Sequence, residues 1–134
     1  MDERPRDAGR ESEPIVESVP FSVSSGTLGD DDIGLIALGG EVDISSAPRF
    51  KKEFEQLIGA GHADIVVDLK GVTFIDSSAL GVLVGAVRRL HPLGGRLVVV
   101  AEGHAVMRPV TLTGLDQVFT VVSDRDEALA AFTG

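Results

Sequence analysis

The 134-residue sequence contains no cysteine, which excludes disulfide frameworks, thiolate zinc sites, iron–sulfur clusters and cysteine nucleophiles. It has three histidines, His62, His91 and His104, and none is paired at the spacing of a histidine-built metal site. Tryptophan and tyrosine are also absent, so only six phenylalanines remain to stack on nucleic-acid bases. These absences predict a protein without a metal or other cofactor, in a reducing compartment.

The charge and the apolar runs argue against two further kinds of partner. The formal net charge is −9, which disfavours nonspecific binding to nucleic acids and to anionic membranes. Apolar runs such as Leu97–Ala101 are far too short to span a bilayer. The first residues lack the basic and apolar regions of a secretory signal. We therefore expect a cytoplasmic protein with no direct contact to nucleic acid or membrane.

Residues 1–20 differ in composition from the rest of the chain. They contain six acids, three arginines and three prolines, but few large aliphatic side chains. Such a segment buries too little apolar surface to offset the entropy lost on ordering. We predict a disordered acidic tail over residues 1–20 and one folded domain over residues 21–134.

Residue patterns predict alternating strands and helices after the tail. Alternation over 21–24, a polar loop over 26–32 and an apolar run over 33–38 indicate a hairpin, with Gly39-Gly40 before a short bent strand over 41–43. Strands that are separated by helices form right-handed parallel crossovers, whereas hairpin strands are antiparallel. The predicted fold class is α/β: a small mixed β-sheet opened by an antiparallel hairpin, with helices packed against it. The next elements, in chain order, are a serine-capped helix over 45–58, a strand over 64–69, a turn at Lys70-Gly71, a strand over 72–75, a helix over 77–90 and a strand over 96–101. A short helix over 105–113 follows, with Pro109 in its first turn or at a bend, and then a strand within 115–122. The last helix begins at a capping box over 123–126 and runs to residue 132.

The segment Asp76-Ser77-Ser78 is a candidate site because it lies where a loop enters a predicted helix. Free N–H groups and the positive end of the helix dipole converge there, so an added phosphate would find hydrogen-bond donors nearby. The competing interpretation is that one serine is a plain N-cap, worth about 1 kcal/mol. Spacing alone favours the plain cap.

Enzymatic interpretations have less support. Ser77 lacks the Gly-x-Ser-x-Gly elbow, and no histidine lies in a setting that would orient it as a base. Glu41 and Asp43 would point to the same side of a strand, either as an acid–base pair or as caps of the following helix. The acidic run over 30–32 lacks the ligand spacing of a calcium loop. We predict that the chain is not an enzyme, and a small serine hydrolase built on Ser77 is the least favoured alternative.

Five blocks of the sequence resemble one known family. They are Leu38–Asp43 before the serine-capped helix, Ile65–Leu69, Val72–Leu83, Gly94–Leu97 and Leu112–Leu115. In this order they resemble the STAS-domain anti-sigma factor antagonists of bacterial partner-switching systems, and the likeness covers about residues 21–132. The resemblance implies a single STAS-like domain that regulates transcription without catalysing a reaction.

The resemblance also implies specific partners. Members of this family bind an anti-sigma factor that is also a serine kinase of the histidine-kinase-like ATPase fold, and thereby release its sigma factor. The kinase inactivates the antagonist by phosphorylating the first serine after the aspartate, which is Ser77 in this sequence. A metal-dependent serine phosphatase of the 2C type removes the phosphate.

A partner-binding surface around Ser77 is implied as well, and Ala79 is its unusual member. The family usually has glycine at this position. A methyl group there strengthens the helix by up to about 1 kcal/mol, and we expect it to hinder the approach of the kinase. The positions that match this surface are Asp43, Asp76, Ser78, Ala79 and Gly81.

A different role within the same fold stays open at this point. Some STAS domains sense a small ligand, such as a nucleotide or a lipid, or act as scaffolds in larger complexes. Such relatives tend to lack the serine pair, so the Asp76-Ser77-Ser78 segment weighs against this alternative.

Overall fold

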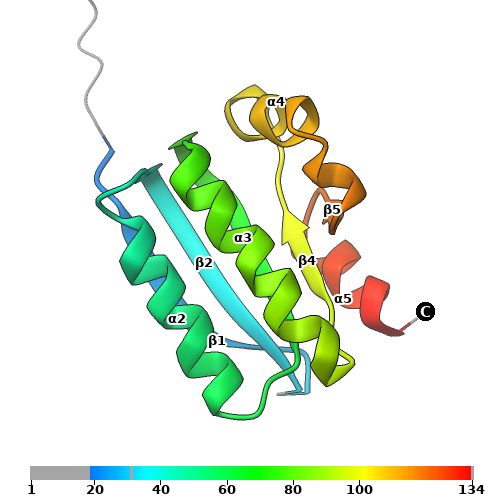
Figure 1. Ribbon diagram of the computed structural model, residues 1–134. Coiled ribbons are helices and arrows are strands. Elements are labelled where there is room, and N and C mark those ends of the chain that lie inside the picture. The colour runs from blue at the N-terminus through cyan, green and yellow to red at the C-terminus, as the bar shows by residue number, and fades with distance from the viewer. Residues whose placement is uncertain (1–18, 31, 134) are drawn as a thin grey trace, which may run out of the picture.

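The computed structural model describes residues 19–30 and 32–133, so the predicted tail over residues 1–20 lies almost wholly outside the described residues. The described residues form a five-stranded sheet with the strand order β1-β2-β3-β4-β5 (Figure 1). β1 and β2 form an antiparallel hairpin, and all later pairs are parallel. The predicted mixed α/β fold is therefore confirmed. The strands are β1 (Ser22–Leu28), β2 (Ile33–Val42), β3 (Asp64–Ile75), β4 (Leu97–Val100) and β5 (Thr120–Val122).

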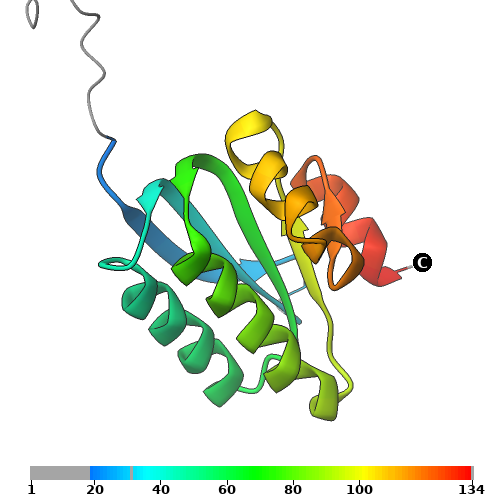
Figure 2. The same ribbon diagram turned by 45° about the horizontal axis from the view of Figure 1, so that its top comes forward.

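The helices cover both faces of the sheet. α2 and α3 lie side by side on one face, and α5 lies on the other, as Figures 1 and 2 show. The main core is closed by α2, α3 and α4, whereas α5 covers a smaller cluster on the opposite face. The helices are α2 (Ala47–Gly59), α3 (Ser77–Leu90), α4 (His104–Leu112) and α5 (Arg125–Thr133), with short 3₁₀ turns η1 (His91–Leu93) and η2 (Leu115–Gln117).

The central strand β3 is longer than the sequence suggests. The predicted turn at Lys70-Gly71 is wrong, because both residues belong to one twelve-residue strand. Between the pairs Ala37↔Asp68 and Gly39↔Gly71, β3 has one residue more than β2, which is a β-bulge. The Lys70 N–H donates to the Asp68 side chain over 2.9 Å. The strand continues through the Lys-Gly pair because β3 stays paired with β2 after the bulge, at Gly39↔Gly71 and Gly40↔Val72.

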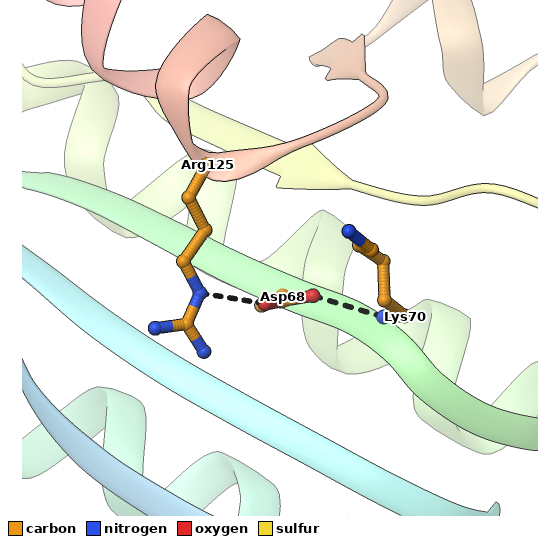
Figure 3. A network of polar contacts seen from close by, with 3 residues as sticks. All are labelled: Asp68, Lys70 and Arg125. Carbon is orange, nitrogen blue, oxygen red and sulfur yellow. Dashed lines mark hydrogen bonds and ion pairs between the residues drawn. The ribbon is translucent and has the colours of Figure 1, made fainter.

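A partly buried ion pair joins β3 to the start of α5 (Figure 3). Asp68 is only 8% exposed. Its Oδ2 accepts a hydrogen bond of 2.7 Å from Nε of Arg125, the first residue of α5, and its Oδ1 accepts from the Lys70 N–H. Both carboxylate oxygens are thus satisfied, as a nearly buried charge requires. The ion pair ties the C-terminal helix to the middle of the sheet.

Several predicted boundaries shift in the structure. β1 reaches Leu28, which shortens the expected 26–32 loop, and only residues 120–122 of the expected 115–122 strand are a strand. Pro109 is the sixth residue of α4, beyond its first turn. The capping box of α5 is shifted by one residue: Asp124 Oδ1 accepts from the Glu127 N–H, and Glu127 Oε1 accepts from the Ser123 N–H, both over 2.8 Å.

Candidate functional site

The candidate site forms where β2 and β3 end at the same edge of the sheet. Val42 pairs with Ile75, and the Asp76 N–H donates to the Val42 carbonyl over 3.2 Å. Asp43 follows β2 and Asp76 follows β3, so the parallel pairing brings these two predicted site residues to one edge. Helix α3 begins directly after Asp76, and helix α2 begins after a short turn that follows Asp43.

Asp76, and not a serine, caps helix α3. Its Oδ1 accepts hydrogen bonds from the backbone N–H groups of Ser78, over 2.9 Å, and of Ala79, over 3.2 Å. Ser77 is therefore the first helical residue, and the interpretation of a serine as the plain N-cap is wrong. The Ser77 side chain is exposed, and its hydroxyl makes no hydrogen bond within the described residues. The fold presents this hydroxyl to solvent.

The capping carboxylate changes what a phosphate on Ser77 would meet. The expected N–H donors of Ser78 and Ala79 are already bound to Asp76, so they are not free for a phosphate. A phosphoryl group on Ser77 would instead add about −1.5 to −2 charges next to the Asp76 carboxylate. A phosphate on Ser77 would thus change the surface charge of the first turn of α3, and the N–H groups of that turn would not bind it tightly.

The other predicted residues of α3 differ in exposure. Ser78 is half-buried and lines a groove between α2 and α3, and Gly81 is exposed. Ala79 is 0% exposed and packs in the main core. The expectation that its methyl group faces an approaching kinase is therefore wrong, because that methyl group points inward.

Asp43 organises the turn between β2 and α2. Its Oδ1 accepts from the Ser45 hydroxyl over 2.7 Å and from the Ser45 N–H over 3.0 Å. The Ser45 hydroxyl bond is the main reason why the pKa of Asp43 lies below its usual value, and desolvation opposes it. The N-cap of α2 is Ser46, whose side chain makes no capping bond to the helix but accepts from the Asp43 N–H. Asp43 therefore stabilises a turn. This role argues against the alternative that Asp43 and Glu41 form an acid–base pair.

Two exposed apolar side chains lie at the same edge, and neither is among the predicted site residues. Ile44, which follows Asp43, is 74% exposed, and Phe74, near the end of β3, is 50% exposed. Exposed apolar groups beside polar ones are typical of protein-binding surfaces. An isoleucine placed between Asp43 and Ser45, outside the strand and the helix, was the available signal.

The described residues offer no catalytic partner to Ser77. His62 contacts the Asp32 carbonyl over 3.3 Å, and His91 and His104 are exposed at the ends of α3 and α4. Within residues 19–30 and 32–133, no three acidic or histidine side chains are grouped as metal ligands. In the same part of the chain, no helix has the length and apolar character needed to cross a membrane.

Comparisons with known proteins agree with this architecture. The model of the STAS domain family matches residues 27–128. The anti-sigma-F factor antagonist RsfB of Mycobacterium tuberculosis is 26% identical over 117 residues, which are 87% of this chain and 95% of that protein. The crystal structure of an anti-sigma factor antagonist from Mycobacterium paratuberculosis has a TM-score of 0.77 and 30% identity, and the match covers 88% of this chain and all of that one.

A third comparison shows the shared fold alone. The structure of Bacillus SpoIIAA in its phosphorylated form has a TM-score of 0.63 at 20% identity, and the match covers 84% of this chain and 99% of that one. The mixed sheet with its antiparallel opening hairpin, and helices on both faces, defines a small α/β domain of the STAS type. The chain belongs to the STAS domain family, and the relatives that it resembles are named as regulatory antagonists rather than as enzymes.

Proposed function

We propose that this protein is an anti-sigma factor antagonist that is switched off by phosphorylation of Ser77. In the unmodified state it binds an anti-sigma factor that is also a serine kinase of the histidine-kinase-like ATPase fold, and the sigma factor is released. A 2C-type phosphatase returns the modified protein to its active state. These events belong to the bacterial cytoplasm.

The exposed Ser77 hydroxyl is the observation that carries this proposal. A kinase needs an acceptor hydroxyl that its active site can reach, and Ser77 lies at the outer end of α3 with no hydrogen bond to any described residue. The Asp76 cap holds the backbone of the first turn in place. The Mycobacterium relatives carry the same named function over nearly their whole length, which supports the same role here.

Exposed apolar groups next to Ser77 supply the means of docking. Ile44 and Phe74 are at least half exposed and lie at the edge where Asp43 and Asp76 also lie. A partner that covers this edge buries apolar area and brings its active site to the Ser77 hydroxyl. The same contact surface then serves both sigma-factor release and the phosphorylation that ends it.

Charge repulsion explains how the phosphate ends the interaction. One pair of like charges about 6 Å apart at an effective dielectric of about 20 costs roughly 3 kcal/mol. That energy corresponds to an affinity loss of about 100-fold. A phosphate beside Asp76 would meet an acidic group of the partner with this penalty, and no refolding is needed.

Phosphorylation mapping tests the proposal. The purified chain is incubated with ATP and, in turn, with each anti-sigma kinase of the histidine-kinase-like ATPase fold encoded in the source genome. We expect one kinase to transfer one phosphate to the wild type and to Ser78→Ala, but none to Ser77→Ala. Phosphate on Ser78 alone would contradict the site, and no transfer or binding with any of these kinases would contradict the function.

A further inference from the structure

A groove runs between α2 and α3 and begins beside Ser77. Its volume is about 460 Å³, and Ser78 lines it together with apolar side chains of both helices, including Phe54 and Ile58 of α2 and Val82 of α3. Phe54 is almost completely buried, whereas Ile58 and Val82 are partly exposed in the groove. The groove thus has an apolar lining that is continuous with the candidate site through Ser78.

Two glycines keep the groove open on the side of α3. Gly81 and Gly85 are one helical turn apart, and both line the groove. A Cβ atom added at either position would meet no atom within 4 Å, and neither residue has a positive φ. Glycine is among the least favourable residues in a helix interior, so the fold itself gains nothing from these two. Their effect is to leave room above α3 for atoms from outside the chain.

The rim of the groove carries two bases and one acid in a protein that is acidic overall. Lys51, Glu55 and Arg89 line it, and Glu55 is 3.9 Å from Arg89 in an exposed ion pair. The net charge of the chain is −9, so a positive helix face is a local exception. α2 and α3 together carry the bases Arg49, Lys51, Lys52, Arg88 and Arg89 but only the acids Glu53 and Glu55.

We propose that this groove receives a segment of the anti-sigma partner that has apolar side chains flanked by carboxylates. The inference rests on the proposed function and extends it from the Ser77 edge along α2 and α3. A kinase that reaches the Ser77 hydroxyl also reaches Ser78, where the groove begins, so the two contact areas are continuous. Apolar side chains of the partner fill the space above Gly81 and Gly85, and its carboxylates face Lys51 and Arg89.

The test measures the affinity of the full chain for the anti-sigma kinase that phosphorylates Ser77, by isothermal titration calorimetry. Gly85→Leu fills the groove, and we expect it to weaken binding at least tenfold. Gly59→Leu is the matched control: Gly59 is an exposed helical glycine outside the groove lining, with no atom within 4 Å of an added Cβ. We expect Gly59→Leu to bind the kinase with the wild-type affinity. Because leucine favours a helix more than glycine does, neither variant should have a lower melting temperature than the wild type.

A charge reversal gives an independent measurement. Lys51→Glu should weaken binding at least fivefold, whereas Lys52→Glu, on the neighbouring exposed residue outside the groove lining, should stay within twofold of the wild type. If Gly85→Leu and Lys51→Glu bind like the wild type while phosphorylated Ser77 still blocks binding, the groove inference is wrong and the proposed function stands. If no kinase binds the wild type, both fail.

Other occupants of the groove give different results. A rise in kinase affinity on Lys51→Glu would indicate that the acidic N-terminal residues of this chain occupy the groove. Self-association of the wild type that disappears in Gly85→Leu, measured by analytical ultracentrifugation, would indicate a second copy. Either result overturns the proposal.

Discussion

Replacement of Asp76 separates its role as a helix cap from its role as a charge beside Ser77. Asp76→Ala removes the acceptor of two N–H groups, at 2.9 and 3.2 Å, and leaves them unpaired in a partly buried turn. Loss of an N-cap side chain costs about 1 kcal/mol, within a range of about 0.5–2 kcal/mol. Loss of a negative charge at the helix N-terminus adds about 0.3–1 kcal/mol. We expect Asp76→Ala to lower the free energy of unfolding by about 1–2 kcal/mol.

The matched variant is Asp76→Asn, which keeps the acceptor and removes the charge. Asparagine caps helices about as well as aspartate, so only the charge–dipole part of the stability should be lost. Urea unfolding followed by circular dichroism at 222 nm is the suitable assay, because the chain has no tryptophan or tyrosine to report by fluorescence. The melting temperature of Asp76→Ala should fall by roughly 3–8 °C for a domain of this size. Equal stability of Asp76→Ala and the wild type would refute the capping assignment.

Three further predictions concern the scaffold. Arg125→Met should lower the free energy of unfolding by about 1–3 kcal/mol in urea titrations, because Asp68 keeps its charge but loses its ionic partner. The double variant Arg125→Met with Asp68→Asn should recover part of this loss, because the unpaired charge is then removed. Hydrogen bonds lower the pKa of Asp43 in the folded chain, so its contribution to stability is present above about pH 4 and is lost as the pH falls through the lowered pKa. In Asp43→Asn, the free energy of unfolding should therefore fall less steeply below about pH 4 than in the wild type. Gly40 has φ +76°, and a Cβ there would lie 2.1 Å from a backbone carbonyl oxygen, so Gly40→Ala should lower the free energy of unfolding by about 2 kcal/mol or more. The control is Gly26→Ala: an added Cβ there meets no atom within 4 Å, and the free energy of unfolding should change by less than about 0.5 kcal/mol.

The order of the elements could be predicted because it depends on local patterns, whereas the choice of Ser77 as the phosphorylated residue rests on the family resemblance. Apolar stripes and β-branched runs define most of the helices and strands, and alternation of the two leads to parallel pairing after one hairpin. An Asp-Ser-Ser segment at a helix start places a serine hydroxyl near the surface whichever residue caps. That Asp76 is the cap depends on the backbone geometry of the turn, whereas spacing alone indicated one of the serines as the cap.

Features that depend on distant residues were missed for a physical reason. Asp68 and Arg125 are 57 positions apart, and nothing in either neighbourhood signals the ion pair. β3 continues through Lys70-Gly71 because it pairs with β2 there, and a local pattern cannot show that pairing. The exposure of Ile44 depends on the path of the turn between β2 and α2, which hydrogen bonds from Ser45 to Asp43 hold and which the residue pattern does not give.

The central claim is that a negative group on the Ser77 hydroxyl ends docking. The most direct measurement compares the affinity of the unmodified chain and of the chain stoichiometrically phosphorylated on Ser77 for the same anti-sigma kinase, by isothermal titration calorimetry at physiological ionic strength. We predict that the phosphorylated chain binds about 100-fold more weakly, with an unchanged circular dichroism spectrum. Equal affinities of the two forms would contradict the account.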